Sequence, residues 1–356
     1  MRIAQLAPTY ERVPPATYGG TELVVHLLTE ELVRRGHDVT LFATGDSETS
    51  ATLRALTPAP VRYGGAGTIR HPEHIHLANA QACFREAAAG AFDLVHNHAG
   101  LEGLVLAATS DTPVITTNHN AFASGTESVW DAYPWRHVSL SGASAVTFPK
   151  PGALVPVHNG IDVDSFPFAE SPTDDLLFLG RLSPEKGPDR AIAAARRASR
   201  SLVLAGKIDA VDRPYFDLAV APLLDDGQAR FIGEVDANQK RELLSRSAAL
   251  LFPIEWEEPF GLVVVEALAC GTPVVAFDRG GVREIIEHGE TGFVVDGVEA
   301  MAEAIRHIGA LSRRRCRRAA EERFDVGRMV DDYEARYSET IAGGLLAADV
   351  SALVRW

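Results

Sequence analysis

The chain has 356 residues, 46% of them apolar, which is enough to form two domains of ordinary size with a core in each. Its formal net charge of −14 disfavours nucleic acid and anionic lipid as partners, because the surface as a whole repels anions. The three cysteines, Cys83, Cys270 and Cys316, are far apart and odd in number, so they predict neither a disulfide framework nor a metal site. Reduced thiols, a strand-like start and the lack of an apolar stretch of roughly 20 residues favour a cytoplasmic protein without a transmembrane segment.

The first half of the chain is predicted to alternate strands and helices. A short apolar strand, Arg2–Ala7, precedes a loop rich in Pro and Gly and then a helix from about Thr21 to Arg35. We expect Thr21 to cap the start of this helix and Gly36 to end it in the left-handed conformation. Further strands are predicted at Asp38–Ala43, Phe92–His96, Pro113–Thr117, Ala145–Phe148 and Leu154–Val157. This alternation indicates a parallel sheet with helices on both faces.

The alternation stops near Asn159–Pro172, where turn residues gather, and then begins again. A strand at Leu176–Leu179 leads through the loop Gly180–Gly187 into a helix at Pro188–Ala198. Later strands are predicted at Leu202–Ala205, Ala229–Ile232, Ala248–Phe252, Pro273–Phe277 and Gly292–Val295, and helices near Asn238–Arg246, Gly261–Ala269, Val282–Glu287 and from about Val298 to Tyr337. The pattern therefore predicts two doubly wound α/β domains, at 1–165 and 172–325, followed by a helical segment at 326–356. We expect this segment to pack back on the first domain.

The basic run Arg313–Arg318 stands near the end of this acidic chain. A patch of arginines can bind nucleic acid, but in a chain with this net charge a solvated helix face is the favoured interpretation.

Ligands of open α/β sheets bind at the carboxyl ends of the strands, so residues that follow the predicted strands are candidate site residues. The first strand and its loop are followed by Tyr18-Gly19-Gly20-Thr21-Glu22. The paired glycines would let a ligand approach the backbone, and the start of the next helix offers free N–H groups. A flexible loop with a helix cap explains the same residues equally well.

Two cations, Arg181 and Lys186, lie in the loop after the first strand of the second half. Arginine offers a planar fork for phosphate and lysine a compact positive charge. Two cations in one strand-to-helix loop of an acidic chain indicate an anion site, although two ordinary surface charges would give the same pattern.

Two carboxylates, Glu258 and Glu266, stand eight positions apart in the sequence Glu-Pro-Phe-Gly-Leu-Val-Val-Val-Glu. The first ends a loop, and the second lies farther along the helix that follows. Carboxylates accept hydrogen bonds from hydroxyls, and the unpaired N–H groups at the helix start favour a diphosphate between them. A surface loop before an amphipathic helix is the plain alternative. Together with Arg181 and Lys186, these residues predict a nucleoside diphosphate pocket.

A resemblance to a known family rests on five segments, which are Asn159–Asp162, Gly180–Gly187, Glu258–Glu266, Gly271–Val275 and Gly289–Phe293. In this order they resemble the retaining glycosyltransferases of family 4, also called glycosyl transferases group 1, over nearly the whole chain. The N-terminal segments Tyr18–Glu22, His96-Asn-His98 and Asn118-His119 are less specific. The resemblance implies the GT-B fold, in which two Rossmann-like domains face a central cleft, with the acceptor bound by the first domain and the nucleotide sugar by the second.

By position, the resemblance implies a role for individual residues. Glu258 matches the carboxylate that holds hydroxyls of the donor sugar, Glu266 the one that binds ribose, and Arg181 and Lys186 the pair that holds the diphosphate. His119 matches a histidine near the transferred sugar. The catalytic candidates are therefore His119, Glu258, Arg181 and Lys186; further donor-binding candidates are Gly20, Phe260, Gly261, Leu262 and Glu266; and the acceptor-binding candidates are Tyr18, Gly19, His98 and Asn118.

The resemblance also implies a reaction without a metal ion or cofactor, because the cations and the helix N-terminus take the part of the metal. The expected donor is a nucleotide-diphosphate sugar, with a UDP- or GDP-sugar favoured, and the expected acceptor is a small molecule or a saccharide. The anomeric configuration is retained in a front-face transfer, in which the leaving phosphate deprotonates the acceptor. No nucleic acid is expected as a partner.

Two clusters of rings allow more than one interpretation. His96, His98 and His119 could meet if their strands are neighbours, but zinc takes three or four ligands and no carboxylate or cysteine is committed there, so hydrogen-bonded histidines are favoured over a metal site. The segment from Asn120 to Phe148 carries Trp130, Tyr133, Trp135 and His137. These rings either stack on a sugar face or fill a core.

Two other hypotheses remain in competition, and a third is disfavoured. A sugar-nucleotide epimerase or a phosphorylase could use the same fold, although a pyridoxal phosphate enzyme needs a Schiff-base lysine and the lysines are few: Lys150, Lys186, Lys207 and Lys240. A non-catalytic nucleotide-sugar sensor is the second alternative. A dinucleotide-dependent dehydrogenase is disfavoured, because the first strand-to-helix turn lacks Gly-x-Gly-x-x-Gly.

Overall fold

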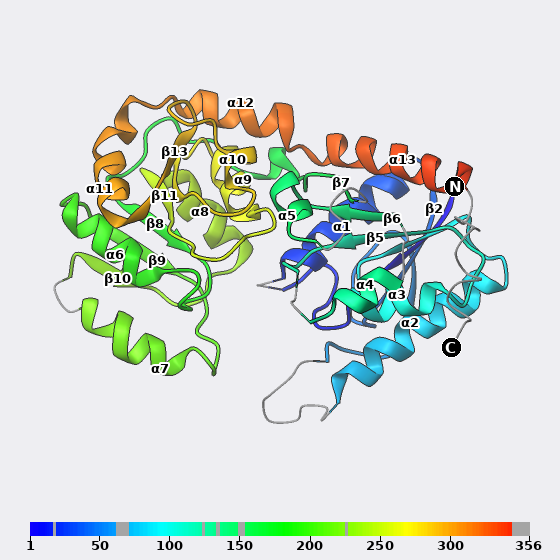
Figure 1. Ribbon diagram of the computed structural model, residues 1–356. Coiled ribbons are helices and arrows are strands. Elements are labelled where there is room, and N and C mark those ends of the chain that lie inside the picture. The colour runs from blue at the N-terminus through cyan, green and yellow to red at the C-terminus, as the bar shows by residue number, and fades with distance from the viewer. Residues whose placement is uncertain are drawn as a thin grey trace. The chain divides into compact units, whose positions relative to one another are not determined.

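A computed structural model describes residues 1–16, 19–61, 71–122, 125–132, 136–148, 154–224 and 227–343. The chain divides into two compact units. The first contains Met1–Gly160 together with the C-terminal part from Val326, and the second contains Ile161–Asp325. Each unit is an α/β domain built around one parallel sheet, as Figure 1 shows.

The first unit contains a seven-stranded parallel sheet in the order β3-β2-β1-β4-β5-β6-β7. Its strands are β1 (Arg2–Leu6), β2 (Asp38–Ala43), β3 (Thr52–Ala55), β4 (Leu94–Asn97), β5 (Val114–Asn118), β6 (Arg136–Ser139) and β7 (Leu154–Pro156). The strand order reverses between β1 and β4, and in such sheets ligands bind at the carboxyl ends beside this reversal. The helices of the unit are α1 (Gly20–Arg34), α2 (Pro72–Ala88), α3 (Leu101–Ala107), α4 (Glu127–Ala132) and α5 (Gly142–Val146).

The last helix, α13 (Val326–Ala342, red in Figure 1), packs on the first unit although it follows the second in the chain. It contacts α1 and β5, and its buried Tyr333 and Tyr337 reach the centre of the sheet. Arg35, just after α1, forms ion pairs with Asp331 and Glu334 of α13. Buried tyrosines and these ion pairs hold the C-terminal helix on the N-terminal sheet.

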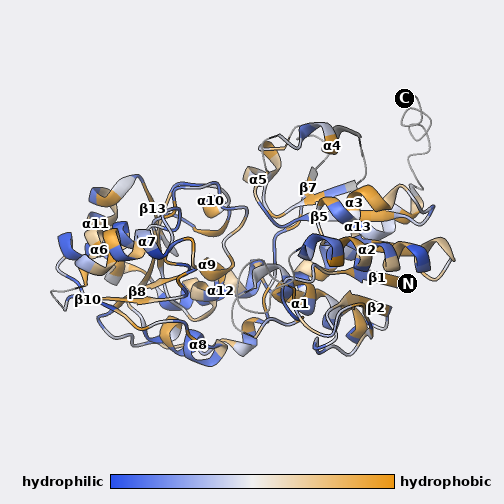
Figure 2. Cartoon of the chain, turned by 90° about the horizontal axis from the view of Figure 1, so that it is seen from below, coloured by the Kyte–Doolittle hydropathy of each residue, from blue (hydrophilic) through white to orange (hydrophobic). Residues whose placement is uncertain are grey.

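The second unit contains a six-stranded parallel sheet in the order β10-β9-β8-β11-β12-β13. Its strands are β8 (Leu176–Leu179), β9 (Leu202–Ala205), β10 (Ala229–Phe231), β11 (Ala249–Phe252), β12 (Val274–Phe277) and β13 (Gly292–Val295). Its helices are α6 (Pro188–Arg197), α7 (Arg213–Tyr215), α8 (Ala237–Arg246), α9 (Leu262–Ala269), α10 (Val282–Ile285), α11 (Gly297–His307) and α12 (Arg313–Arg323). Here the order reverses between β8 and β11. Strands β1 and β8 are largely hydrophobic in Figure 2, and most of their residues are buried, as expected for parallel sheets covered on both faces.

Several predicted elements differ from the structure. Residues 145–148, predicted as a strand, begin inside helix α5, whose cap Ser141 accepts a hydrogen bond from Ser144 N. The strand of this region is the preceding β6, which the sequence analysis missed together with β3 and α2. Thr21 does not cap α1, because the helix already begins at Gly20 and Gly19 is its cap. Gly36 does adopt the predicted left-handed conformation, with φ of +86°.

The interpretation of the basic run as a solvated helix face is wrong for Arg313. This side chain is buried at the start of α12 and donates to the carbonyl oxygens of Ala169, Ser245 and Ser247. Arg313 therefore fastens α12 to the rest of the second unit. Its neighbour Arg314 is exposed and paired with Glu170, as a solvated face requires.

Candidate active site

In the second unit, two loops meet where β8 and β11 end. These strands are neighbours in the sheet, so the loop Gly180–Gly187 after β8 lies beside the loop that follows β11. Glu255 N donates to Glu185 O at 3.0 Å and joins the two loops. A Cβ atom on Gly187 would lie 2.5 Å from the carbonyl oxygen of Pro253, and its φ is +73°, so only glycine allows this close approach.

Lys186 and Glu258, which are 72 positions apart in the chain, form an ion pair between these loops. The Lys186 Nζ to Glu258 Oε2 distance is 2.5 Å, and the two side chains are only 13% and 16% exposed. Trp256 Nε1 donates to the same carboxylate oxygen at 3.1 Å, and its ring lies 4.8 Å from Nζ. The structure therefore brings together two of the predicted catalytic residues.

The backbone of Glu258 is held from the other side by the turn after β12. Gly281 N donates to Glu258 O at 3.0 Å. Gly280 has φ of +56°, and a Cβ atom there would lie 2.1 Å from the same carbonyl oxygen. The position of the Glu258 loop thus depends on a glycine whose backbone touches it.

Helix α9 begins directly after this loop. Its cap, Gly261, is left-handed with φ of +102° and provides no side chain to the N–H groups of the first turn. Phe260 is buried and packs edge-on against Phe324 at 5.9 Å between ring centroids, which anchors the helix start. Leu262 is the first residue of the helix. The free N–H groups of a helix start attract an anion.

Glu266 lies in the second turn of α9 and is 3% exposed. Its carboxylate accepts a hydrogen bond of 2.5 Å from Lys240 Nζ of the neighbouring helix α8. Lys240 was not among the site residues predicted from the sequence. The sequence around Lys240 shows only a lysine in the first turns of a predicted helix, and this does not indicate that Glu266 is its partner.

Arg181 lies among carboxylates. It donates to Glu185 Oε1 at 2.7 Å and lies 3.7 Å from Asp209 and 3.9 Å from Asp212. Burial, and after it the nearby Glu185, raises the pKa of Asp212. A phosphate group that binds Arg181 would compete with these acids for its guanidinium group.

Three of the predicted residues of the first unit, His98, Asn118 and His119, lie at the ends of β4 and β5. His98 Nδ1 lies 2.8 Å from His119 Nε2, and His98 Nε2 lies 2.8 Å from Gln5 Oε1. Asn118 ends β5, and its buried Nδ2 has no hydrogen-bond partner among the described residues. Gly19 and Gly20 form the cap and first residue of α1, and Tyr18 lies outside the described residues.

Three histidines of this region are neutral at ordinary pH. Burial lowers the pKa of His119 to about 4 and holds the pKa values of His96 and His98 well below the usual range. His96 is bonded to Tyr337 and Thr117, both at 2.7 Å, and His98 to Gln5 and His119. In the described part of the chain, the side chains that lie close enough to share a metal ion are instead His71, Glu73 and His74.

The profile of Glycosyl transferases group 1 matches residues 164–323, and that of Glycosyltransferase Family 4 matches residues 18–165. Together they cover the chain except for its two ends.

The chain belongs to the glycosyl transferases group 1.

Relatives match this glycosyltransferase over most of its length. It is 29% identical to the phosphatidyl-myo-inositol mannosyltransferase of Mycolicibacterium smegmatis, with 99% of this chain and 97% of the relative covered. It is 27% identical to a glycogen synthase of Mycobacterium tuberculosis, with 90% of each protein covered. The crystal structure of AviGT4, a glycosyltransferase involved in avilamycin A biosynthesis, superposes with a TM-score of 0.76 at 26% identity and covers 96% of this chain and 98% of AviGT4. The GT-B fold that the resemblance implied is confirmed.

No helix in the described part of this glycosyltransferase has both the length and the apolar character that a membrane crossing requires. Of the aromatic residues between Asn120 and Phe148, Trp130 packs on His137 and Phe148, each at 5.3 Å between ring centroids. These contacts favour the core-filling interpretation for Trp130. Tyr133 and Trp135 lie outside the described residues.

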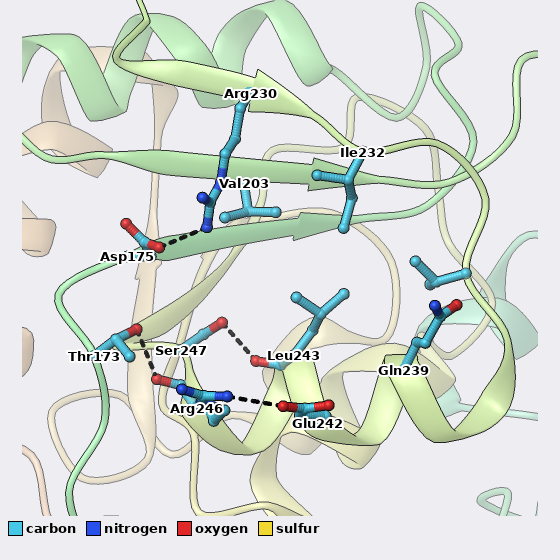
Figure 3. A pocket seen from close by; sticks show the side chains of 11 residues that line it. Thr173, Asp175, Val203, Arg230, Ile232, Gln239, Glu242, Leu243, Arg246 and Ser247 are labelled. Carbon is cyan, nitrogen blue, oxygen red and sulfur yellow. Dashed lines mark hydrogen bonds and ion pairs between the residues drawn. The ribbon is translucent and has the colours of Figure 1, made fainter.

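A pocket of about 370 Å³ lies in the second unit between α8 and the strands β8 to β10 (Figure 3). Leu243 of α8 and Val203 of β9 line it, and Arg230 reaches across to Asp175 at 2.9 Å. None of the predicted donor-site residues lines this pocket. Its charged groups are paired with each other, so it is separate from the site at the ends of β8 and β11.

Proposed function

We propose that this glycosyltransferase transfers a hexosyl group from a nucleoside diphosphate sugar to a hydroxyl of a small molecule or saccharide. The observation that carries the proposal is the Lys186–Glu258 pair, which is held beside the uncapped start of α9. A cation, a helix start and a carboxylate are the groups that a diphosphate and a sugar hydroxyl require. The relatives named above, a glycogen synthase and a mannosyltransferase, support a hexosyl donor.

In the proposed reaction, the bond between the sugar C1 and the diphosphate oxygen breaks and the acceptor oxygen bonds to C1 on the same face. The leaving phosphate oxygen takes the acceptor proton, so the anomeric configuration is retained. Negative charge grows on the diphosphate, where Lys186, Arg181 and the N–H groups of α9 stabilise it. These groups supply the charge that a metal ion would otherwise provide, so we propose a metal-independent reaction.

Binding of the donor rearranges the two ion pairs of the loops. Lys186 would turn from Glu258 toward a phosphate oxygen, and Glu258 would then accept hydrogen bonds from the sugar. Arg181 would exchange Glu185 for phosphate. Glu266 would remain bonded to Lys240 and accept hydrogen bonds from the ribose hydroxyls on its second oxygen.

The first test is substitution of the pair. We expect Glu258→Gln and Lys186→Met each to lower kcat by about 100-fold or more, which is the usual cost of removing a group that stabilises transition-state charge. The matched control is Glu255→Gln, an exposed carboxylate in the same loop that pairs with Arg190. Folded Glu258 and Lys186 variants with full turnover would remove the basis of the proposal.

The donor can be identified by a thermal-shift screen against UDP-, GDP-, ADP- and TDP-sugars, because a ligand stabilises the fold in proportion to the logarithm of its excess over Kd.

NMR of the product then reports the anomeric configuration, and a β-product from an α-linked donor would reject retention. Activity that disappears with EDTA and returns with a divalent cation would reject metal independence. Binding without hydrolysis or transfer would favour the sensor, and absorbance from pyridoxal phosphate would favour the phosphorylase.

A further inference from the structure

A chain of buried hydrogen bonds runs through the first unit from α13 to the end of β5. Gln5 Nε2 donates to Tyr337 OH at 3.2 Å, and Gln5 Oε1 lies 2.8 Å from His98 Nε2. His98 Nδ1 in turn lies 2.8 Å from His119 Nε2. Gln5 and Tyr337 have no exposed surface, and His98 is 4% exposed, so water does not compete for these bonds.

The orientation of the Gln5 amide fixes the position of each proton in this chain. Gln5 Oε1 is a carbonyl oxygen and can only accept, so His98 Nε2 must carry the proton and donate. A neutral imidazole has one N–H, so His98 Nδ1 is an acceptor. His119 Nε2 must then carry the proton that fills the bond between the two rings. The remaining nitrogen of His119, Nδ1, is left with its lone pair.

Nδ1 of His119 has no hydrogen-bond partner among the described residues. His119 is only partly buried, follows the last residue of β5, and makes no hydrogen bond through Nδ1 to a described residue. Residues directly after the strands of such a sheet stand at the edge where ligands bind. An uncharged nitrogen lone pair attracts a hydrogen-bond donor and repels an anionic oxygen.

We propose that Gln5 and His98 are positioning residues that hold His119 as the Nε2–H tautomer, so that its Nδ1 accepts a hydrogen bond from a hydroxyl of the substrate. This part of the site would take a neutral hydroxyl and reject a carboxylate or phosphate. The identity of the hydroxyl rests on the proposed function, whereas the tautomer does not. Burial, which keeps His119 and His98 neutral, supports the assignment.

The same amide orientation predicts a third tautomer. Tyr337 OH accepts from Gln5 and therefore donates to His96 Nδ1 at 2.7 Å. His96 Nε2 must then donate to Thr117 Oγ1, also at 2.7 Å. All three histidines should carry the proton on Nε2. If the Gln5 amide were turned over, every bond would reverse and all three would carry it on Nδ1.

The deciding experiment is long-range ¹⁵N–¹H NMR of the unliganded wild-type protein with labelled histidine, at neutral pH. Loss of individual signals in His96→Gln, His98→Gln and His119→Gln variants assigns the rings. We expect Nε2–H tautomers at all three positions. An Nδ1–H tautomer or an imidazolium at His119 would overturn the inference, whether or not any sugar donor has been found.

A kinetic test uses the variant Gln5→Leu, which removes the hydrogen-bond acceptor that fixes the tautomer of His98. We expect mixed tautomers at His119 and a kcat/KM lower by about tenfold, the factor for one ordinary hydrogen bond. Thr117→Val is the control, because it removes the acceptor of His96 and leaves the Gln5–His98–His119 chain intact; it should keep the His119 tautomer. A folded Gln5→Leu variant with an unchanged tautomer would contradict the role of Gln5, and if this variant does not fold, the wild-type spectrum still decides.

Discussion

Lys240 holds the buried carboxylate of Glu266 through a bond of 2.5 Å from the adjacent helix. If Glu266 binds the ribose, loss of Lys240 leaves a buried carboxylate without the partner that orients it. We expect Lys240→Met to raise the KM for the donor by about tenfold, the factor for one hydrogen bond, and to change kcat little. Steady-state kinetics with the donor varied measures this split.

Two further variants separate this role from a general loss of stability. Lys240→Arg keeps a cation near Glu266 and should restore most of the donor affinity. Arg246→Met removes an exposed cation from the same helix, where it pairs with Glu242, and should leave KM unchanged. A Lys240→Met enzyme with the wild-type KM for the donor would show that donor binding by Glu266 does not require Lys240.

The turn between β12 and α10 determines where the Glu258 loop lies. At Gly280, both the φ of +56° and the 2.1 Å approach of a Cβ atom to Glu258 O exclude any other residue without movement. We expect Gly280→Ala to displace the loop and to lower kcat by roughly 100-fold, because small displacements of a catalytic group cost this much. The measurement is kcat together with a thermal unfolding curve.

Gly289 provides the matched comparison in a neighbouring turn. It also has a positive φ, of +83°, but a Cβ atom there would meet nothing within 4 Å. Gly289→Ala should therefore cost only the backbone strain of about 1–2 kcal/mol and leave kcat unchanged. Equal losses of kcat in the two variants would indicate a general effect of strain rather than contact with Glu258.

Across the whole molecule, sensitivity to acid should differ between the two units. Burial lowers the pKa of His76 and His119 to about 4, and the pKa values of His26, His96 and His98 are also lowered. All five histidines lie in the first unit. The unfolded chain takes up protons on these histidines near pH 6.5, whereas the folded unit takes them up only at lower pH, near pH 4 at His76 and His119, so acid favours unfolding. The stability that these groups contribute is complete above pH 6.5 and falls as pH decreases, by up to about 1.4 kcal/mol per pH unit for each of His76 and His119.

Hydrogen exchange measured by mass spectrometry from pH 7 to pH 5 tests this expectation. After correction for the intrinsic exchange rate, protection of β4 and β5 should decrease, whereas β11 and β12 should keep theirs. Equal losses of protection from hydrogen exchange in both units would show that the buried histidines do not control the stability of the first unit in acid.

Local patterns in the sequence were sufficient for most elements of the two sheets. A short apolar run ending at a Gly-rich loop, such as Leu176–Leu179 before Gly180, predicts a strand because its signal is contained in neighbouring residues. Residues 145–148 were misassigned because three of the four are apolar, as in a buried strand, while Ser141 is a weaker signal for a helix start. Lys186 was predicted because it shares with Arg181 the loop after a predicted strand, and Glu258 because it stands just before a predicted helix start.

The alternation of strands and helices follows from the amino-acid sequence alone, and with it which edge of each sheet carries Lys186, Glu258 and His119. The partners of these residues depend on how the elements pack in three dimensions. Lys240 reaches Glu266 because α8 packs beside α9, and Gln5 sets the protons of His98 because β1 lies next to β4. Periodicity and caps are properties of adjacent residues, whereas a partner is fixed by packing between segments that are far apart in the chain.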